Sequence, residues 1–245
     1  KTKVTNCYGE TFKAELDGYE EFKAVLVPNY KSLFYNPNNQ ELITEGLIAI
    51  TGFKKPDIIH SAEYITTPDK VEDFLFKLMS KPALTIDIET TGLHLGSKIL
   101  SIAFAWDKHN GGVIYMQHIN TKLLRQFFIL YAGKMIFHNA LFDCKHIIHQ
   151  FFPNNLDSRV EMHKGLYAFK NVEDSMLYTY IAKNSRTEVK LDLKSNSLEF
   201  AGNYAVDVKD ATKLPTDVLL EYNLKDCLAT WFVYDKYRDI VIRDN

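Results

Sequence analysis

Two carboxylates lie on one short predicted strand in the first half of the chain. Asp87 and Glu89 alternate with Ile86 and Ile88, which is the period of two that a β-strand produces. Both acids therefore project from the same face, roughly 7 Å apart along the strand. Acidic side chains on an otherwise apolar strand are costly unless something cationic lies between them. A divalent metal ion is the natural candidate.

A third carboxylate follows a second apolar run. The run at 135–137 ends at His138 and Asn139, where a helix is predicted to begin. Asn139 and Asp143 are four residues apart, so they share one face of that helix. Taken alone, the pattern has a simpler interpretation. Asn139 would then be an ordinary helix cap, and Asp143 a solvated acid that favours the helix dipole.

A fourth carboxylate repeats this spacing on a long helix near the end of the chain. Tyr222 and Asp226 are again four residues apart, and their face continues through Leu220, Ala229 and Val233. That face is apolar, and an acid on the buried side of a helix needs a partner. The alternative is that Tyr222 belongs to the core and Asp226 pairs with a lysine.

The elements that must position these residues predict a mixed α/β fold. Three apolar runs, at about 83–90, 99–106 and 113–117, are joined by connections so short that we expect an antiparallel meander. A helix at about 121–131 precedes the run at 135–137, which can therefore return parallel to an existing strand. Capping and apolar spacing predict further helices, which begin at about residues 67, 139, 174, 192 and 216.

The first quarter of the chain carries no motif with a chemical interpretation. Residues 23–27 and 47–50 are predicted to be strands, separated by a turn-rich segment at 36–40. We therefore expect residues 1–61 to form a small β-containing accessory region of unknown function.

The composition limits the class of protein. The chain has 245 residues, 46% of them apolar and 24% charged, with a formal net charge of −2. It can therefore build a proper core, but it has no global basic field to attract nucleic acid. Cys7, Cys144 and Cys227 form no CxxC pair, which argues against structural zinc and a disulfide framework and favours a reducing compartment. No apolar run is long enough for a membrane span, and because the chain begins at Lys1 we expect it to be a piece of a longer protein.

Together, the three acidic segments resemble the three exonuclease motifs of the DEDD family of 3′–5′ exonucleases. Tyr222 lies four residues before Asp226, and Glu221 stands where the other branch has His, so the resemblance is to the Tyr-bearing branch. The segments 87–93 and 138–143 look most like the proofreading domain of bacterial and phage family A DNA polymerases. The resemblance begins at about residue 62 and implies an exonuclease domain at 62–245.

This resemblance implies a ribonuclease H-like fold and a metal-dependent reaction. Asp87, Glu89, Asp143 and Asp226 would bind two divalent ions, Mg²⁺ or Mn²⁺, while Tyr222 orients the attacking water. The enzyme would release nucleoside 5′-monophosphates from single-stranded or frayed DNA 3′ ends. Contacts to the terminal nucleotide are implied for four residues, each with a core or capping alternative: Thr90, Leu93, Asn139 and Phe142.

The resemblance also implies a partner and a place of action. A family A DNA polymerase domain would lie in the same chain or act as a partner. The protein would serve in the cytoplasm of a bacterium or phage-infected cell, or in a DNA-containing organelle. Two other functions stay open: an RNA-trimming exonuclease like ribonuclease D, and a non-catalytic module that only binds DNA or a protein.

Several basic residues and histidines carry weaker expectations. Four cationic side chains either grip phosphates or belong to a solvated face: Lys183, Arg186, Lys190 and Lys194. His146 and His149 could form a metal pair, but exposure on the outer helix face is the preferred interpretation. His138 is expected to pack beside the strand end rather than to act in catalysis.

Overall fold

The chain divides into two compact units, residues 1–57 and 58–245. The computed structural model describes residues 11–14, 22–37, 39–51, 57–152, 159–183, 190–202, 204 and 211–244. The division lies close to the boundary expected near residue 61.

The N-terminal unit contains a β-hairpin and a helix. Strands β1 (Thr11–Ala14) and β2 (Phe22–Val25) pair antiparallel and are followed by a short 3-10 helix, η2 (Tyr30–Phe34). Helix α1 (Asn39–Thr51) completes the described part of this unit.

The strand predicted at 47–50 is wrong, because these residues belong to α1. A short apolar run has no periodicity that distinguishes a strand from a buried helix. Gly46 leaves room for close packing of the helix, since a Cβ at that position would lie 2.2 Å from the side chain of Val27. The helix therefore packs closely on the chain that follows the hairpin.

The C-terminal unit is built on a six-stranded mixed sheet with the order β3-β6-β5-β4-β7-β8. Its strands are β3 (Ser61–Ile65), β4 (Ala83–Thr90), β5 (Ile99–Ala105), β6 (Asn110–Tyr115), β7 (Lys134–Phe137) and β8 (Val172–Asp174). The antiparallel meander of β4, β5 and β6 is confirmed, as is the parallel pairing of β7 with β4. The edge strands β3 and β8 were not predicted, because polar residues interrupt both: Ser61 and Glu63 in β3, and Glu173 and Asp174 in β8.

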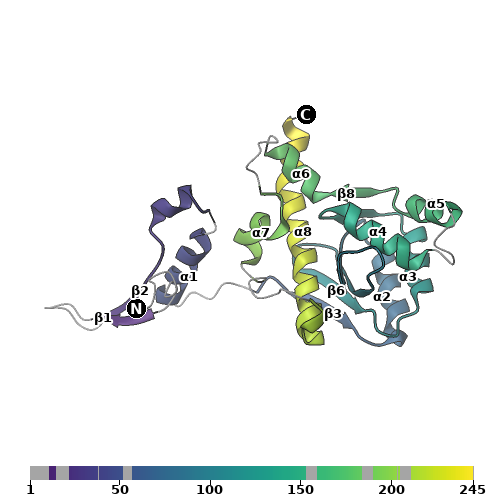
Figure 1. Cartoon of the computed structure of the whole chain (residues 1–245), viewed down its shortest axis with the longest axis horizontal. Coiled ribbons are helices and arrows are strands. Elements are labelled where there is room, and N and C mark those ends of the chain that lie inside the picture. Colours follow the sequence, from purple (N-terminus) through teal and green to yellow (C-terminus); the bar gives the residue numbers. More distant parts are fainter. Residues whose placement is uncertain are drawn as a thin grey trace. The chain divides into compact units, whose positions relative to one another are not determined.

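Seven α-helices and two 3-10 turns are described in this unit. They are η3 (Pro68–Lys70), α2 (Val71–Met79), α3 (Thr121–Leu130), α4 (Ala140–Phe151), α5 (Arg159–Ala168), α6 (Ser175–Ala182), α7 (Leu193–Ala201), η4 (Ala211–Lys213) and α8 (Thr216–Asp244). Of the helices, α5 was not predicted. Figure 1 shows α8 on one side of the sheet, and α2, α3 and α4 on the other.

The two faces of β4 meet different helices. Leu84, Ile86 and Ile88 are buried in the main core, which includes residues of α2, α3 and α4. Thr85 lies on the opposite face, and its hydroxyl donates to the carbonyl oxygen of Cys227 in α8 at 2.9 Å. Since side chains alternate along a strand, Asp87 and Glu89 share the α8 side with Thr85.

Two adjacent glycines in β6 let helices approach both faces of the sheet. A Cβ on Gly111 would lie 2.7 Å from Leu224 of α8 and 2.6 Å from the carbonyl oxygen of Phe104. A Cβ on Gly112 would lie 2.6 Å from the ring of Phe74 in α2. The close packing of α8 on the sheet therefore depends on Gly111.

The structure also bears on the cysteines and on membrane association. Cys144 and Cys227 are free thiols, whereas Cys7 lies outside the described residues. Among the helices that the structure describes, none combines the length and apolar character needed to cross a bilayer.

We expect Gly111→Ala to lower the free energy of unfolding by about 1–3 kcal/mol, the usual cost of overpacking a filled interior. The clash includes backbone at Phe104, which cannot relax as a side chain can. Urea unfolding followed by circular dichroism measures the change. Gly96→Ala is the matched control, because its Cβ would meet only the His94 ring at 3.6 and 3.9 Å. Equal stabilities of the two variants would contradict the packing role of Gly111.

Candidate active site

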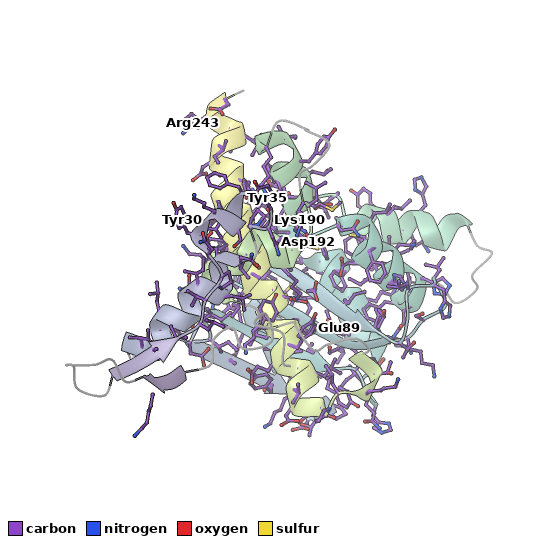
Figure 2. The ribbon with its side chains drawn as sticks, turned by 60° about the vertical axis from the view of Figure 1, so that its left-hand side comes forward. Tyr30, Tyr35, Glu89, Lys190, Asp192 and Arg243 are labelled. Atoms are coloured by element: carbon purple, nitrogen blue, oxygen red, sulfur yellow. The ribbon has the colours of Figure 1, made fainter. Side chains whose placement is uncertain are left out.

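Three of the four predicted acids come together between β4 and α8. Asp87, Glu89 and Asp226 each offer a carboxylate oxygen, and these oxygens all lie within 4.8 Å of one another. Figure 2 labels Glu89, which lies close to the α8 ribbon. The cluster joins residues that are far apart in the sequence, and it offers only oxygen donors, which suit Mg²⁺ or Mn²⁺.

The register between α8 and β4 brings Asp226 to the strand. Thr85 is hydrogen-bonded to the carbonyl of Cys227, and Asp87 accepts from the side chain of Asn223 at 2.7 Å. Two strand residues span roughly 6.8 Å, and four helical residues about 6 Å. One turn of α8 is therefore about as long as two residues of β4. Asp226 lies between Asn223 and Cys227, in the turn of α8 that faces Asp87 and Glu89.

Asp143 reaches the site from the other side of β4. Strand β7 pairs with β4 only as far as Thr85, so the backbone N–H of Ile88 on this edge has no strand partner in that pair. Asp143 takes its place, accepting this N–H at 3.2 Å through Oδ1. Its exposed fraction is 4%, so the alternative of a solvated first-turn acid is wrong.

The N-terminus of α4 is capped by the side chain of Asp174 and not by that of Asn139. Asn139 has the left-handed φ of 69°, and its side chain makes no capping hydrogen bond. Asp174 accepts instead from the backbone N–H groups of Asn139 and Ala140, at 3.0 and 2.8 Å. The capping alternative for the Asn139 side chain is therefore wrong, and this side chain stays available for another contact.

The acids resist ionisation where they lie. Burial, opposed in part by the Lys194 ammonium, raises the pKa of Asp87 to about 6. Burial and the nearby charge of Asp87 raise the pKa of Glu89 to about 8, and the same two causes hold the pKa of Asp143 well above its ordinary value. Such a set of oxygen donors fits a divalent cation, because a nearby positive charge would stabilise the ionised carboxylates.

Lys194 supplies positive charge within the cluster. Its ammonium donates to Asp226 and lies over the rings of Tyr204 and Tyr222, at 4.2 and 4.4 Å from their centroids. The Tyr204 hydroxyl also donates to Asp226. Burial lowers the pKa of Lys194 to about 8. The lysine pairing that the alternative interpretation gave to Asp226 is thus present, but the lysine is itself within the acidic site.

Tyr222 is half-buried beside the acids. Burial first, and then the charges of Glu89 and Asp87, raise the pKa of its phenol far above the ordinary value. The hydroxyl therefore keeps its proton at neutral pH, so it can donate a hydrogen bond but cannot act as a base.

The predicted substrate contacts lie around this cluster with different exposures. Thr90 donates its hydroxyl to the carbonyl oxygen of Gly92 at 2.7 Å, within the turn after β4. Leu93 on that turn is 83% exposed, as an apolar contact for a ligand requires. Phe142 is half-buried, with its ring centroid 4.4 Å from that of His146. The roles of these residues stay predictions.

The histidines have structural surroundings. His146 is 1% exposed, and its ring nitrogens lie 2.9 and 3.2 Å from the carbonyl oxygens of Phe142 and His94. The expectation that it lies on the outer helix face is therefore wrong. His138 lies beside the end of β7, as expected, with its ring nitrogens 2.8 Å from the Ser175 hydroxyl and 2.8 Å from the Leu191 carbonyl oxygen.

The remaining basic residues do not share one location. Lys183 donates to Asn196 at 2.5 Å and lies over the Tyr237 ring, away from the acids. Lys190 is exposed, and Arg186 lies outside the described residues. Of the four, the structure brings Lys194 alone to the acidic cluster, within the part of the chain that it describes.

Three residues of the site were not singled out in the sequence. Asn223 and Ser101 carry no spacing signal, and Tyr204 belongs to no helix or strand among the described residues. The one available hint was the position of Asn223, directly after Tyr222 in the third motif. Only packing shows that it points at Asp87.

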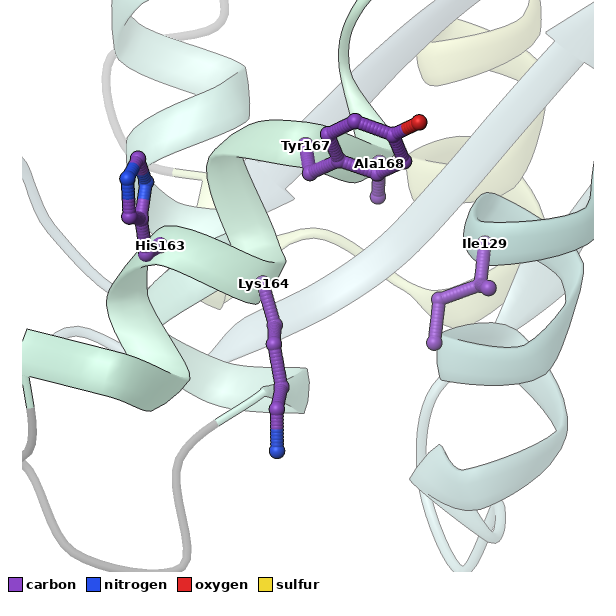
Figure 3. Close-up of a pocket in the computed structure, with 5 residues that line it drawn as sticks. All are labelled: Ile129, His163, Lys164, Tyr167 and Ala168. Carbon is purple, nitrogen blue, oxygen red and sulfur yellow. The ribbon is translucent and has the colours of Figure 1, made fainter.

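A separate hollow of about 560 Å³ lies on α3 and α5, lined by Ile129, His163, Lys164, Tyr167 and Ala168 (Figure 3). Its lining is largely apolar and includes none of the acids. The hollow is therefore separate from the candidate active site.

Comparisons with known proteins agree with this geometry. A family model described as "3′–5′ exonuclease" matches residues 62–242. No curated protein sequence matches the chain. Among solved structures, one described as the apo form of a nuclease is similar with a TM-score of 0.55 and 21% identity, over 75% of this chain and 83% of that one.

Two further structures share the fold. Brucella melitensis NrnC bound to pGG has a TM-score of 0.50 and 18% identity, over 77% of this chain and 84% of that one. Escherichia coli RNase D has a TM-score of 0.53 and 14% identity, over 74% of this chain but only 45% of that one. These similarities confirm the ribonuclease H-like mixed α/β fold.

Without divalent metal, we expect Glu89→Gln to reduce the pH dependence of stability. The folded-state pKa of Glu89 is raised from its ordinary value of 4.5 to about 8, so above pH 4.5 the folded chain binds more protons than the unfolded one. The wild type should therefore lose stability as pH rises from about 5 to 7.5, and the variant should lose less. Urea unfolding in chelator at both pH values measures this. Parallel pH dependence in the two proteins would show that Glu89 is not perturbed.

Proposed function

The chain belongs to the 3′–5′ exonuclease family, and on that premise we propose that it removes nucleotides from the 3′ end of single-stranded or frayed DNA. The observation that carries this proposal is the meeting of Asp87, Glu89 and Asp226 within 4.8 Å. Asp143 accepts from the Ile88 N–H on the same strand, and the charges of Glu89 and Asp87 act on Tyr222. These neighbours support the assignment of all five residues to one site.

The acids fit divalent cations. Asp87, Glu89, Asp143 and Asp226 would hold Mg²⁺ or Mn²⁺, since these ions prefer carboxylate oxygens. When bound, two such ions neutralise phosphate charge and make a water nucleophilic at neutral pH. Lys194 brings a positive charge of its own to Asp226, and its ammonium would be near enough to contact a substrate phosphate.

The chain's own residues would orient the reaction. Tyr222 keeps its proton, so it hydrogen-bonds the attacking water and holds it in line rather than deprotonating it. The water oxygen forms a bond to phosphorus while the bond from phosphorus to the 3′-oxygen of the preceding nucleotide breaks. The water gives up a proton to solvent, and the 3′-oxygen takes one from solvent and becomes the new 3′-hydroxyl. The product is a nucleoside 5′-monophosphate.

A site that accepts only single strands would also select mismatched ends, which is what proofreading requires. A mismatched end costs less to unpair than a matched one, so it reaches the acids more often. We propose a family A DNA polymerase as the associated activity, in the same polypeptide or as a partner. The name of the matching family model refers to DNA polymerase A, which supports this choice.

The second candidate function is RNA trimming at the same site. It is favoured by the similarity to Escherichia coli RNase D, described as an exoribonuclease involved in structured RNA processing. With 14% identity this similarity concerns the fold alone, so it does not displace DNA as the proposed substrate.

We expect Asp87→Ala to lower the rate of cleavage by about 1000-fold. Loss of metal charge stabilisation costs several kcal/mol, and each 1.4 kcal/mol or so is tenfold in rate. Shortening of 5′-labelled single-stranded DNA with Mg²⁺, and with chelator as control, measures the rate. Asp217→Ala, an exposed acid in the first turn of α8, should retain the wild-type rate. The mechanism is wrong if purified Asp87→Ala cuts at the parental rate.

We expect kcat/KM on single-stranded DNA to exceed that on RNA of the same sequence by at least about tenfold, roughly the effect of one mismatched contact at the 2′-hydroxyl. Within DNA duplexes, a mismatched 3′ terminal pair should be removed faster than a matched one. A preference for RNA would select the second candidate. Absence of cleavage of either substrate, with Mg²⁺ and Mn²⁺ both tried, would leave only a binding module.

A further inference from the structure

Asn223 lies between a hydroxyl and a catalytic carboxylate in the interior. Both Asn223 and Ser101 have an exposed fraction of 0%. The Asn223 Nδ2 donates to Oδ2 of Asp87 at 2.7 Å, and the Asn223 Oδ1 accepts from the Ser101 hydroxyl at 3.0 Å. The three side chains thus form a relay, that is, a chain of two hydrogen bonds from Ser101 in β5 through Asn223 in α8 to Asp87 in β4.

The chemistry of the two neighbours fixes the orientation of the Asn223 amide. An ionised carboxylate only accepts hydrogen bonds, whereas a hydroxyl can donate as well as accept. If the amide were flipped, its oxygen would face the carboxylate of Asp87, and two acceptors would meet in a buried place. The Asp87 carboxylate therefore sets the amide orientation, and Ser101 restrains the amide in that orientation by donating to its oxygen.

We propose that Asn223, held by Ser101, is a positioning residue that sets the side-chain conformation of Asp87 for metal binding. The inference deepens the proposed function and rests on it. The hydrogen bond occupies part of one carboxylate, which has about four acceptor sites. Asp87 thus retains the capacity to bind a cation, while the rotation that would take it out of the cluster is restrained.

The position of the relay explains why it would act on the site rather than on the fold. Ser101 is paired with Glu89 in the register of β5 and β4, so the relay begins at the level of the acids. Helix α8 has a separate attachment one turn away, where Thr85 donates to the Cys227 carbonyl. Loss of Asn223 would therefore leave α8 anchored and release Asp87.

The test measures Mn²⁺ affinity by titration calorimetry, with no nucleic acid present. Asn223→Leu keeps a similar volume and removes both hydrogen bonds. It should bind Mn²⁺ about 10–100-fold more weakly, the usual effect of losing a residue that orients a metal ligand. Ser101→Ala removes one neutral hydrogen bond and should weaken binding by about two- to tenfold.

Non-additivity distinguishes a relay from two independent packing effects. If Ser101 acts through Asn223, the double variant should bind Mn²⁺ no more weakly than Asn223→Leu alone. Thr230→Val is the matched control. Thr230 is buried on α8 and is among the described side chains with no hydrogen-bond partner, about 10 Å further along the helix. Its Mn²⁺ affinity should equal that of the wild type.

The outcomes separate this inference from the proposed function. If the wild type binds no Mn²⁺, both the proposed metal site and the role of Asn223 are refuted. If the wild type binds and folded Asn223→Leu binds equally well, the role of Asn223 alone is overturned. Should Asn223→Leu not fold, Ser101→Ala decides: weaker binding supports the relay, and unchanged binding refutes it.

Discussion

The rest of the site depends on the packing of α8 against β4. Thr85 is hydrogen-bonded to Cys227, and Asp87 to Asn223. Both bonds can form because one helical turn is nearly as long as two residues of a strand. This register brings Asp226 to Asp87 and Glu89. It also needs the close approach that Gly111 permits, since a Cβ there would collide with Leu224 and with backbone. A small residue in β6, remote from the chemistry, thus controls the distance between the two halves of the cluster.

The cluster is costly to the fold, and the molecule reduces that cost locally. Burial raises the pKa values of Asp87, Glu89 and Asp143, so their ionisation opposes folding at neutral pH. Lys194 partly offsets this through its charge, and Ile88 and Asn223 each donate one hydrogen bond. These contacts hold the acids in place, but they leave a net demand for positive charge. A divalent ion would supply that charge, so the same arrangement that destabilises the metal-free chain would favour metal binding.

Asp143 shows how the end of a strand pairing can position an acid. Strand β7 stops pairing with β4 after Thr85, which leaves the Ile88 N–H without a strand partner in that pair. The helix that follows β7 returns along this edge and brings Asp143 to that donor. The backbone of β4 thereby orients Asp143, while Asp174 accepts from the first N–H groups of the helix.

The sequence alone determined the acids, the order of the main elements and the meander, because alternation and helical spacing are local properties of the chain. The sequence could not place Asn223, Ser101 or Tyr204, which show no period and acquire meaning only through neighbours more than twenty residues away. It misplaced His146, because a histidine looks the same in sequence whether its ring nitrogens meet water or backbone carbonyls. It also misassigned residues 47–50, since a four-residue apolar run fits either a strand or a helix. Only tertiary packing decided these cases, because long-range contacts set which side chains are buried and which polar groups they meet there.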